Sequence, residues 1–259
     1  MKRKIILLLS TLTFVTANAQ DKIFIGKDTL VSQSQLNKKS SIYKQLIIPT
    51  VLIGYGSLGL VSDGVKDVNH SVRSRLSSRL ATGTTVDDYT RYAPVVSVYA
   101  LNLAGVKGKH GYKDLTIIVA TSHLIMVGAV MGLKSAGKVE RPDGSTNNSF
   151  PSGHTATAFA GAEILWQEYK DVSPWYGVAG FAVATGTGFL RIYNDRHWLT
   201  DIAAGAGIGI LSSKLAYWLH PFIQKHLFSP KDDTDKKVIG MVAPFYNGEQ
   251  AGLSAVIRF

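Results

Sequence analysis

The feature that most limits how this chain can fold is a set of long runs without charged side chains. They cover residues 45–61, 92–106 and 115–133. The last run has 19 residues, close to the roughly 20 that an apolar helix needs to cross a bilayer. Only 18% of all residues are charged, which is low for a soluble domain. The sequence therefore predicts a helical, mostly membrane-embedded protein.

The first 19 residues have the pattern of a secretory signal peptide. Three basic residues at 2–4 precede a short apolar core at 5–15, and residues 17–19 read Ala-Asn-Ala, a small-residue cleavage site. An uncleaved anchor is the alternative. We expect an N-terminal arm at 20–44, a helical domain at 45–221, and a linker with a tail at 222–259. Asn247 and Gly248 form a turn signal that predicts a small β-hairpin in that tail.

Two further segments have helical patterns. Residues 62–91 place apolar side chains at helical spacing beside arginines, which is typical of an amphipathic basic helix in the headgroup region, or of an ordinary surface helix. The runs 92–106 and 115–133 flank a basic loop at 107–114 and predict a helical hairpin. The last helix is expected from about Trp198 to Leu219.

The net charge of +10 and the absence of cysteine limit the possible partners and sites. Without cysteine, disulfides and thiolate metal sites are excluded. An excess of basic over acidic residues suits binding to nucleic acid, to an anionic membrane surface or to an anionic substrate. No nucleic-acid motif is present, so we expect membrane lipids and an anionic substrate as partners, and no nucleic acid.

Polar residues at defined spacings interrupt the apolar sequence between positions 134 and 201. Cations together with hydroxyl and backbone donors suit a phosphate-like oxyanion. His197 stands four residues before Asp201, a spacing that places both on one face of a helix and suits a nucleophile held by an orienting carboxylate. Taken alone, this spacing more often marks a surface His–Asp pair.

These residues form three motifs: KSAGKVERP at 134–142, PSGH at 151–154 and LRIYNDRHWLTD at 190–201. Their order and spacing resemble the type 2 phosphatidic acid phosphatase superfamily, which also contains bacterial acid phosphatases and vanadium haloperoxidases. Leu190 departs from the pattern, because a serine usually precedes the third-motif arginine. The resemblance covers residues from about 115 to 219. It implies an all-α bundle of about six core helices, mostly membrane-embedded.

The resemblance also implies a role for each motif residue. His197 would attack phosphorus to form a phosphohistidine, Asp201 would orient it, and His154 would protonate the leaving group as general acid. The phosphate would be bound by five residues: Lys134, Arg141, Ser152, Gly153 and Arg191. No metal or other cofactor is implied. Glu163 and His123, which lie in apolar runs, are expected to be core residues rather than groups of a substrate channel.

We expect an envelope phosphatase that hydrolyses a lipid phosphate monoester or diphosphate of the lipid A, undecaprenyl diphosphate or phosphatidate type. A soluble periplasmic acid phosphatase, a vanadium-dependent haloperoxidase and a non-catalytic envelope protein are the alternatives. The expected location is the bacterial inner membrane, with the site facing the periplasm. That orientation requires one of the three uncharged runs not to cross, and the glycine-rich run 45–61 is the predicted exception.

Overall fold

The fold is described by a computed structural model, which covers residues 33–76, 83–228, 239–246 and 251–258. Side chains are described within 43–76 and 83–228. The predicted signal peptide lies outside these ranges. The described helices are α2 (Gln33–Leu58), α3 (Asp63–Leu76), α4 (Val86–Thr90), α5 (Ala93–Leu103), α6 (Tyr112–Gly137), α7 (Gly153–Tyr169), α8 (Pro174–Tyr193) and α9 (Leu199–Ile223). This architecture confirms the helical fold class that the sequence predicts.

Local sequence signals explain where several helices begin and end. The hydroxyl of Ser152 accepts a hydrogen bond from the backbone N–H of Thr155 and caps α7. Ser173 precedes α8, whose first residue is Pro174, at the position where proline is best tolerated. Helix α6 ends at Lys138, which adopts the left-handed conformation with φ 44°.

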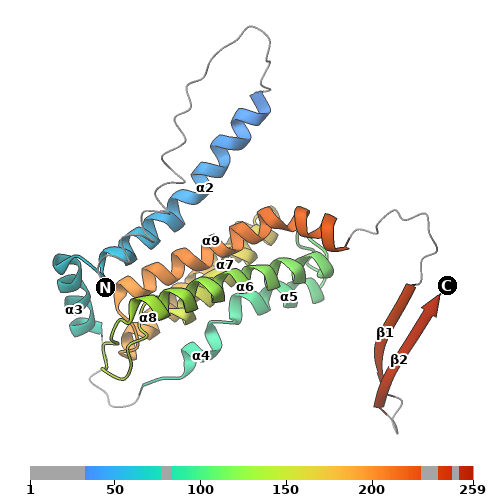
Figure 1. Ribbon diagram of the computed structural model, residues 1–259. Helices are drawn as coiled ribbons and strands as arrows, with labels where there is room; N and C mark the ends of the chain where they lie inside the picture. The colour runs from blue at the N-terminus through green and yellow to red at the C-terminus, as the bar shows by residue number, and fades with distance from the viewer. Residues whose placement is uncertain (1–32, 77–82, 229–238, 247–250, 259) are drawn as a thin grey trace. The chain divides into compact units, whose positions relative to one another are not determined.

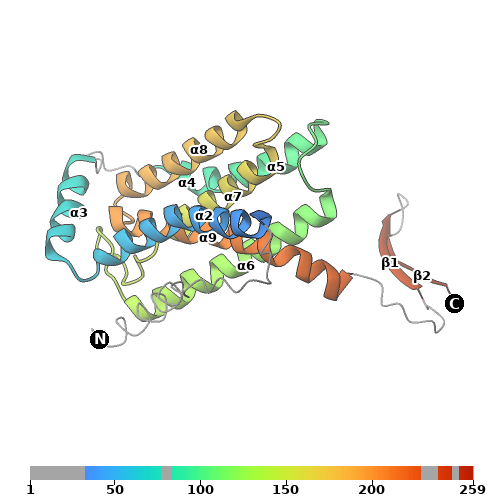
Figure 2. The same cartoon turned by 90° about the horizontal axis from the view of Figure 1, so that it is seen from above.

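Helix α9 runs through the bundle beside α7 (Figures 1 and 2), and most of its residues are buried. Its small residues let neighbouring backbones approach closely. A side chain at Gly209 would clash with the backbone of α7 at Ala156 and Ala160, and one at Gly205 would meet the carbonyl of Ser152 at 2.5 Å. Ser213 donates a hydrogen bond to the carbonyl of Ala160 over 2.9 Å. The glycines therefore bring α9 against α7, and this contact fixes the start of α9 beside the start of α7.

Helices α5 and α6 both pack against α7 rather than mainly against each other. The apolar cluster that joins them consists of Val98, Leu115, Ile164, Leu165 and Tyr169, all nearly or fully buried. The two helices of the predicted hairpin still touch near the loop that joins them, where the hydroxyl of Tyr99 on α5 donates to that of Thr116 on α6 over 3.2 Å. Within residues 62–91, the predicted amphipathic basic helix is present as α3, with Arg73 and Arg75 in its last turn. The short helix α4 begins separately at Val86, after the non-helical residues 83–85.

Within the part of the chain that the structure describes, two helices are long and apolar enough to cross a membrane: α6, and α9 with its extension to Phe228. Helices α2 and α3 pass the same test only as a pair bent by 94°, as in a broken span or a re-entrant loop. Helix α6 also exposes large apolar side chains, including Leu124 at 75% and Met131 at 62%. A lipid environment would cover such surfaces, which supports a membrane-embedded bundle.

The segment from Pro221 onward is a separate unit. It contains strands β1 (Ile239–Tyr246) and β2 (Ala251–Arg258), which pair antiparallel with Ile239 opposite Arg258 and Tyr246 opposite Ala251. The predicted turn at Asn247 and Gly248 lies outside the described residues.

Candidate active site

The three sequence motifs meet at one end of the bundle. Lys134 lies in the last turn of α6, and Arg191 lies in the last turn of α8. The PSGH segment opens α7, and Asp201 lies in the first turn of α9. Because α6 and α8 end where α7 and α9 begin, residues up to 67 positions apart in the sequence become neighbours.

Hydrogen bonds between two loops hold the motifs in register. The backbone N–H of Ser152 donates to the carbonyl of Asp201 over 3.1 Å, which links the second motif to the third. The indole N–H of Trp198 donates to the carbonyl of Glu140 over 2.9 Å, which links the third motif to the first. The loop that follows α6 is therefore fixed to the loop that precedes α9.

His197 and Asp201 lie together, but not on one helix as the spacing predicted. His197 precedes α9 by two residues and is 2% exposed. Its Nδ1 lies 3.5 Å from Oδ2 of Asp201, a long contact of the kind that often tightens when substrate binds. The hydroxyl of Ser149 donates to the same Oδ2 over 2.5 Å and lies 3.4 Å from Nδ1. Ser149, which sequence reasoning missed, completes a buried triad.

The surroundings of His197 favour its neutral form. Burial lowers its pKa to about 4, the carboxylate of Asp201 opposes this shift, and the positive charges of Arg191 and Lys134 add to it. A neutral imidazole has a free lone pair, so this histidine is suited to act as a nucleophile near neutral pH.

The three motif cations lie around the same region. The ammonium of Lys134 donates to the carbonyl of Asn148. Burial and the positive charge of Arg191 lower the pKa of Arg141. The Nε atoms of Arg141 and Arg191 are both buried without a hydrogen-bond partner among the described residues. Two such orphaned donors would be satisfied by an oxyanion.

The start of α7 carries the other predicted phosphate contacts. The hydroxyl of Ser152 is fully buried and lies 2.9 Å from the hydroxyl of Thr155, in addition to capping the helix. The backbone N–H groups of Gly153 and His154 belong to the first turn, where no intrahelical acceptor exists. The serine hydroxyl is thus already engaged by Thr155, whereas these backbone N–H groups have no acceptor within the helix.

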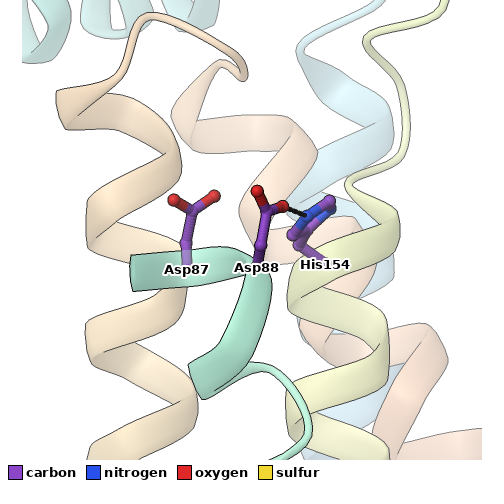
Figure 3. A group of neighbouring side chains, drawn as sticks. All are labelled: Asp87, Asp88 and His154. Carbon is purple, nitrogen blue, oxygen red and sulfur yellow. Dashed lines mark hydrogen bonds and ion pairs between the residues drawn. The ribbon is translucent and has the colours of Figure 1, made fainter. Parts of the chain in front are cut away.

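His154 lies at the mouth of the site and has an acidic neighbour from α4. Its Nε2 is 2.7 Å from Oδ1 of Asp88, and Figure 3 shows the two side chains facing each other. A guanidinium nitrogen of Arg91 lies 3.1 Å from the same Nε2. The pKa of His154 is lowered chiefly by burial, while the hydrogen bond to Asp88 raises it and the charges of Arg191 and Arg91 lower it further.

A cavity of about 640 Å³ joins residues of all three motifs. Arg141, His154 and Arg191 line it together with Asp87, Asp88, Asp143, Asn194 and Arg196. The lining of this cavity does not include the other five predicted site residues: Lys134, Ser152, Gly153, His197 and Asp201. The buried His197 is joined to the cavity wall through Arg191, whose carbonyl accepts its backbone N–H over 3.3 Å.

Asp87 is a second acidic residue that the sequence did not single out. It is 1% exposed, pairs with the guanidinium of Arg191 and accepts a hydrogen bond from the side chain of Asn194 over 3.0 Å. Ligand atoms of Asp87, Asp88 and His154 lie within 4.8 Å of one another, so a cation could fit by distance (Figure 3). Each carboxylate, however, is already paired with a cationic or protonatable side chain. No metal is needed to explain this cluster.

Residues 109–225 match the family model of the PAP2 superfamily. The chain is 40% identical over 144 residues to a lipid A 1-phosphatase of Porphyromonas gingivalis, which covers 54% of this chain and 32% of that protein. It is 36% identical over 75 residues to the bacitracin transport permease protein BcrC of Bacillus licheniformis, covering 29% of this chain and 35% of that protein. The matched regions thus span about a third of each curated relative.

Two solved structures are similar. The LpxE structure from Aquifex aeolicus aligns with 58% of this chain and 95% of its own at a TM-score of 0.45 and 22% identity. A transmembrane PAP2 type phosphatidylglycerolphosphate phosphatase from Bacillus subtilis aligns with 71% of this chain and 99% of its own at a TM-score of 0.44 and 18% identity.

Proposed function

We propose that the protein belongs to the PAP2 superfamily, whose family model residues 109–225 match, and that it is a membrane lipid phosphatase that acts through a phosphohistidine. One observation carries this proposal: Arg141, His154 and Arg191, each from a different motif, line one cavity beside the His197–Asp201 pair. Two cations with orphaned Nε donors suit the charge of a phosphoryl group, and the histidines suit nucleophilic attack and proton transfer.

In the first half of the reaction, the lone pair of Nε2 of His197 attacks phosphorus. The phosphorus–oxygen bond to the leaving group breaks, and its electron pair goes to the leaving oxygen, which takes a proton from His154. The Nδ1–H of His197 donates to Asp201, whose negative charge stabilises the phosphorylated imidazolium. Lys134, Arg141 and Arg191 neutralise the charge that develops on the phosphoryl oxygens, with the backbone N–H groups of Gly153 and His154 as further donors.

In the second half, water attacks the phosphorus of the phosphohistidine. His154, now neutral, takes the proton from the water, and the electrons of the phosphorus–nitrogen bond return to Nε2 of His197. Inorganic phosphate leaves, and both histidines regain their starting protonation states. No step in this cycle requires a metal.

A lipid substrate is supported by the apolar surroundings of the site. An apolar groove of about 420 Å³ lies between α5, α7 and α8 and is lined by Pro94, Leu101, Leu165 and Val183 among others. Pro94 lies near the start of α5, three residues after Arg91, which contacts His154. An acyl chain in this groove would bring its headgroup toward the cavity. The lipid A 1-phosphatase of Porphyromonas gingivalis makes a lipid A phosphate the first substrate to test.

We also propose that the protein is inserted in the inner membrane with the site facing the periplasm. Two features support this orientation. Residues 1–19 resemble a signal peptide, and the basic loop at 107–114 lies at the end of α6 opposite Lys134. Release of the protein by a carbonate wash would instead indicate the soluble periplasmic alternative.

The decisive test is phosphate release by the purified protein in detergent micelles from lipid A, undecaprenyl diphosphate, phosphatidate and phosphatidylglycerol phosphate. We expect release from at least one of them, and none from the His197→Ala variant. His226→Ala is the matched control, because His226 is exposed and bonds only to its own helix. Wild-type-like turnover by His197→Ala would refute the mechanism. Activation of a peroxidase by vanadate, rather than inhibition of phosphate release, would favour the haloperoxidase alternative.

A further inference from the structure

We propose that Asp88 of α4 is a positioning residue for the general acid: it orients His154 and keeps it protonated, so that the enzyme can act on esters with poor leaving groups. The proposal rests on the proposed phosphatase function and deepens it. Helix α4 lies outside residues 109–225, the region that matches the superfamily, so this role comes from the structure alone.

Helix α4 has only five residues, but it is firmly anchored to α8 and to the turn that follows α8. The buried Asp87 pairs with Arg191 and accepts from Asn194. The same Asn194 side chain exchanges two hydrogen bonds with the backbone of Thr84, over 3.0 and 2.8 Å. At the other end of α4, the hydroxyls of Thr90 and Thr187 lie 2.9 Å apart. The backbone of Asp88, the residue next to Asp87, is therefore held in place, and its half-exposed side chain (52%) reaches His154 from there.

That next residue, Asp88, points to His154 across the cavity wall (Figure 3). An ionised carboxylate only accepts hydrogen bonds, so the 2.7 Å contact requires a hydrogen on Nε2 of His154. The second nitrogen, Nδ1, is then the atom whose proton can be lost. With Nε2 bonded to Asp88, the ring cannot turn freely, and Nδ1 keeps one direction relative to the bound phosphate ester.

The charges around His154 explain why an acidic partner is needed. Arg91 lies 3.1 Å from Nε2 and 3.4 Å from Nδ1, and Arg191 acts from α8. Both positive charges, together with burial, oppose protonation of the imidazole, whereas Asp88 and Asp87 favour it. The interaction also works in the other direction, because His154 lowers the pKa of Asp88 and keeps this carboxylate ionised. Without Asp88, His154 would lose its proton at a lower pH.

The consequence is specific to the leaving group. A sugar or glycerol alkoxide is a strong base and must be protonated as it departs, whereas p-nitrophenolate departs without help. General acid catalysis contributes on the order of 10²- to 10⁴-fold in rate. Loss of its positioning residue should remove part of that factor for an alkyl phosphate and little of it for p-nitrophenyl phosphate.

The test compares kcat of wild type, Asp88→Asn and Asp88→Glu on a lipid phosphate and on p-nitrophenyl phosphate over a range of pH. We expect Asp88→Asn to lower kcat on the lipid phosphate by on the order of tenfold to a hundredfold, to change KM little, and to spare p-nitrophenyl phosphate. The alkaline limb of its pH profile should move to lower pH. Asp88→Glu should restore part of the activity. Asp171→Asn, an exposed carboxylate in the turn after α7, is the matched control.

An opposite variant separates electrostatics from a general loss of structure. Arg91→Gln removes a positive charge beside the same ring and should move the alkaline limb to higher pH. Shifts of both variants in the same direction, an equal loss on both substrates, or a change in KM alone would overturn the proposal. So would a higher kcat for Asp88→Asn, which would mean that Asp88 merely competes with phosphate.

A measurement that needs no turnover distinguishes failure of this proposal from failure of the proposed function. The pKa of His154, followed by NMR of labelled histidine in micelles, should fall in Asp88→Asn and stay unchanged in Asp171→Asn. An unchanged pKa in Asp88→Asn overturns the proposal even in an active enzyme. An inactive wild type with the expected pKa change would instead overturn the phosphatase assignment.

Discussion

The buried ion pair between Glu163 and Lys214 offers the sharpest test of how the bundle is held together. Oε1 of Glu163 on α7 lies 2.6 Å from the ammonium of Lys214 on α9, and the two side chains are only 4% and 10% exposed. The same oxygen accepts a hydrogen bond from Gln167 over 2.7 Å. Removal of one partner from such a pair leaves an uncompensated charge in an apolar interior, which costs about 3–5 kcal/mol.

The single variant Glu163→Gln keeps the side-chain shape and an acceptor oxygen but leaves the buried ammonium of Lys214 without a negatively charged partner. At about 2–4 °C per kcal/mol for a domain of this size, the apparent Tm in micelles should fall by roughly 6–20 °C. In the double variant Glu163→Gln/Lys214→Met no charge remains, so most of the loss should be recovered. The activity per folded molecule should not change, because Glu163 does not line the cavity.

The exposed pair of Lys66 and Asp63, with a similar distance of 2.8 Å, is the matched control. Lys66→Gln should cost less than about 1 kcal/mol, because solvent screens such a pair. The reasoning would be refuted if Glu163→Gln and Lys214→Met each lowered the Tm by the same amount and the two losses simply added in the double variant. A loss of kcat at unchanged Tm in Glu163→Gln would instead support the substrate-channel role that the sequence left open.

Two further predictions concern the chemistry. The pH profile of kcat/KM should be bell-shaped, with its maximum on the acidic side of neutrality. Activity should be lost as the pH falls through about 4, where His197 takes up a proton, and as the pH rises through a value below 6.5, where His154 loses one. An alkaline optimum would contradict these roles. Ser149→Ala removes a hydrogen bond to the carboxylate of Asp201, worth about 1.5–3 kcal/mol. This variant should lower kcat by about tenfold to a hundredfold and leave both limbs of the pH profile in place. An unchanged kcat would show that the backbone N–H of Trp198, which donates to the same oxygen over 2.9 Å, is sufficient to hold Asp201.

Much of the site could be predicted because its residues stand at the ends of strongly apolar helices. The apolar runs locate α6 and α9, and the polar motifs follow where these runs stop or begin. Because Ser152 is a strong capping residue and Gly153 follows it, the start of α7 is also readable from sequence. The family resemblance then groups Lys134, Arg141 and Arg191 in one region. In the structure Arg191 acts electrostatically on both Arg141 and His197, and Lys134 acts on His197.

The position of His197 was wrong for an identifiable reason. A separation of four residues brings two side chains together on a helix, but a loop that leads into the first turn can do the same. Here Asp201 accepts a hydrogen bond from the backbone N–H of Trp198, and the helix begins only at Leu199. His197 and Asp201 still lie together, because the carboxylate of Asp201 stabilises the turn that carries the imidazole of His197. Spacing alone cannot separate these two cases.

The acidic residues of α4 could not be predicted at all. Asp88 is 66 positions from His154, and Asp87 is 104 positions from Arg191. No spacing rule connects such residues, and two adjacent aspartates before an apolar run are typical of an ordinary helix start. Only the packing of α4 against α7 and α8 brings them to the cavity.

The structure also bears on which of the uncharged runs does not cross the membrane. The site lies at the end of α6 that carries Lys134, and the basic loop 107–114 lies at the other end, so an exported site keeps this loop inside. That orientation still requires one earlier run not to cross. Helix α5 has 11 residues and rises only about 16 Å, roughly half of the hydrocarbon thickness. Helix α2 has 26 residues and contains Pro49. Neither earlier run forms a straight span by itself, because α2 reaches span length only together with α3 across a bend of 94°. The exception predicted at 45–61 therefore stays a prediction, and either choice places Lys134 on the outer face of an exported site.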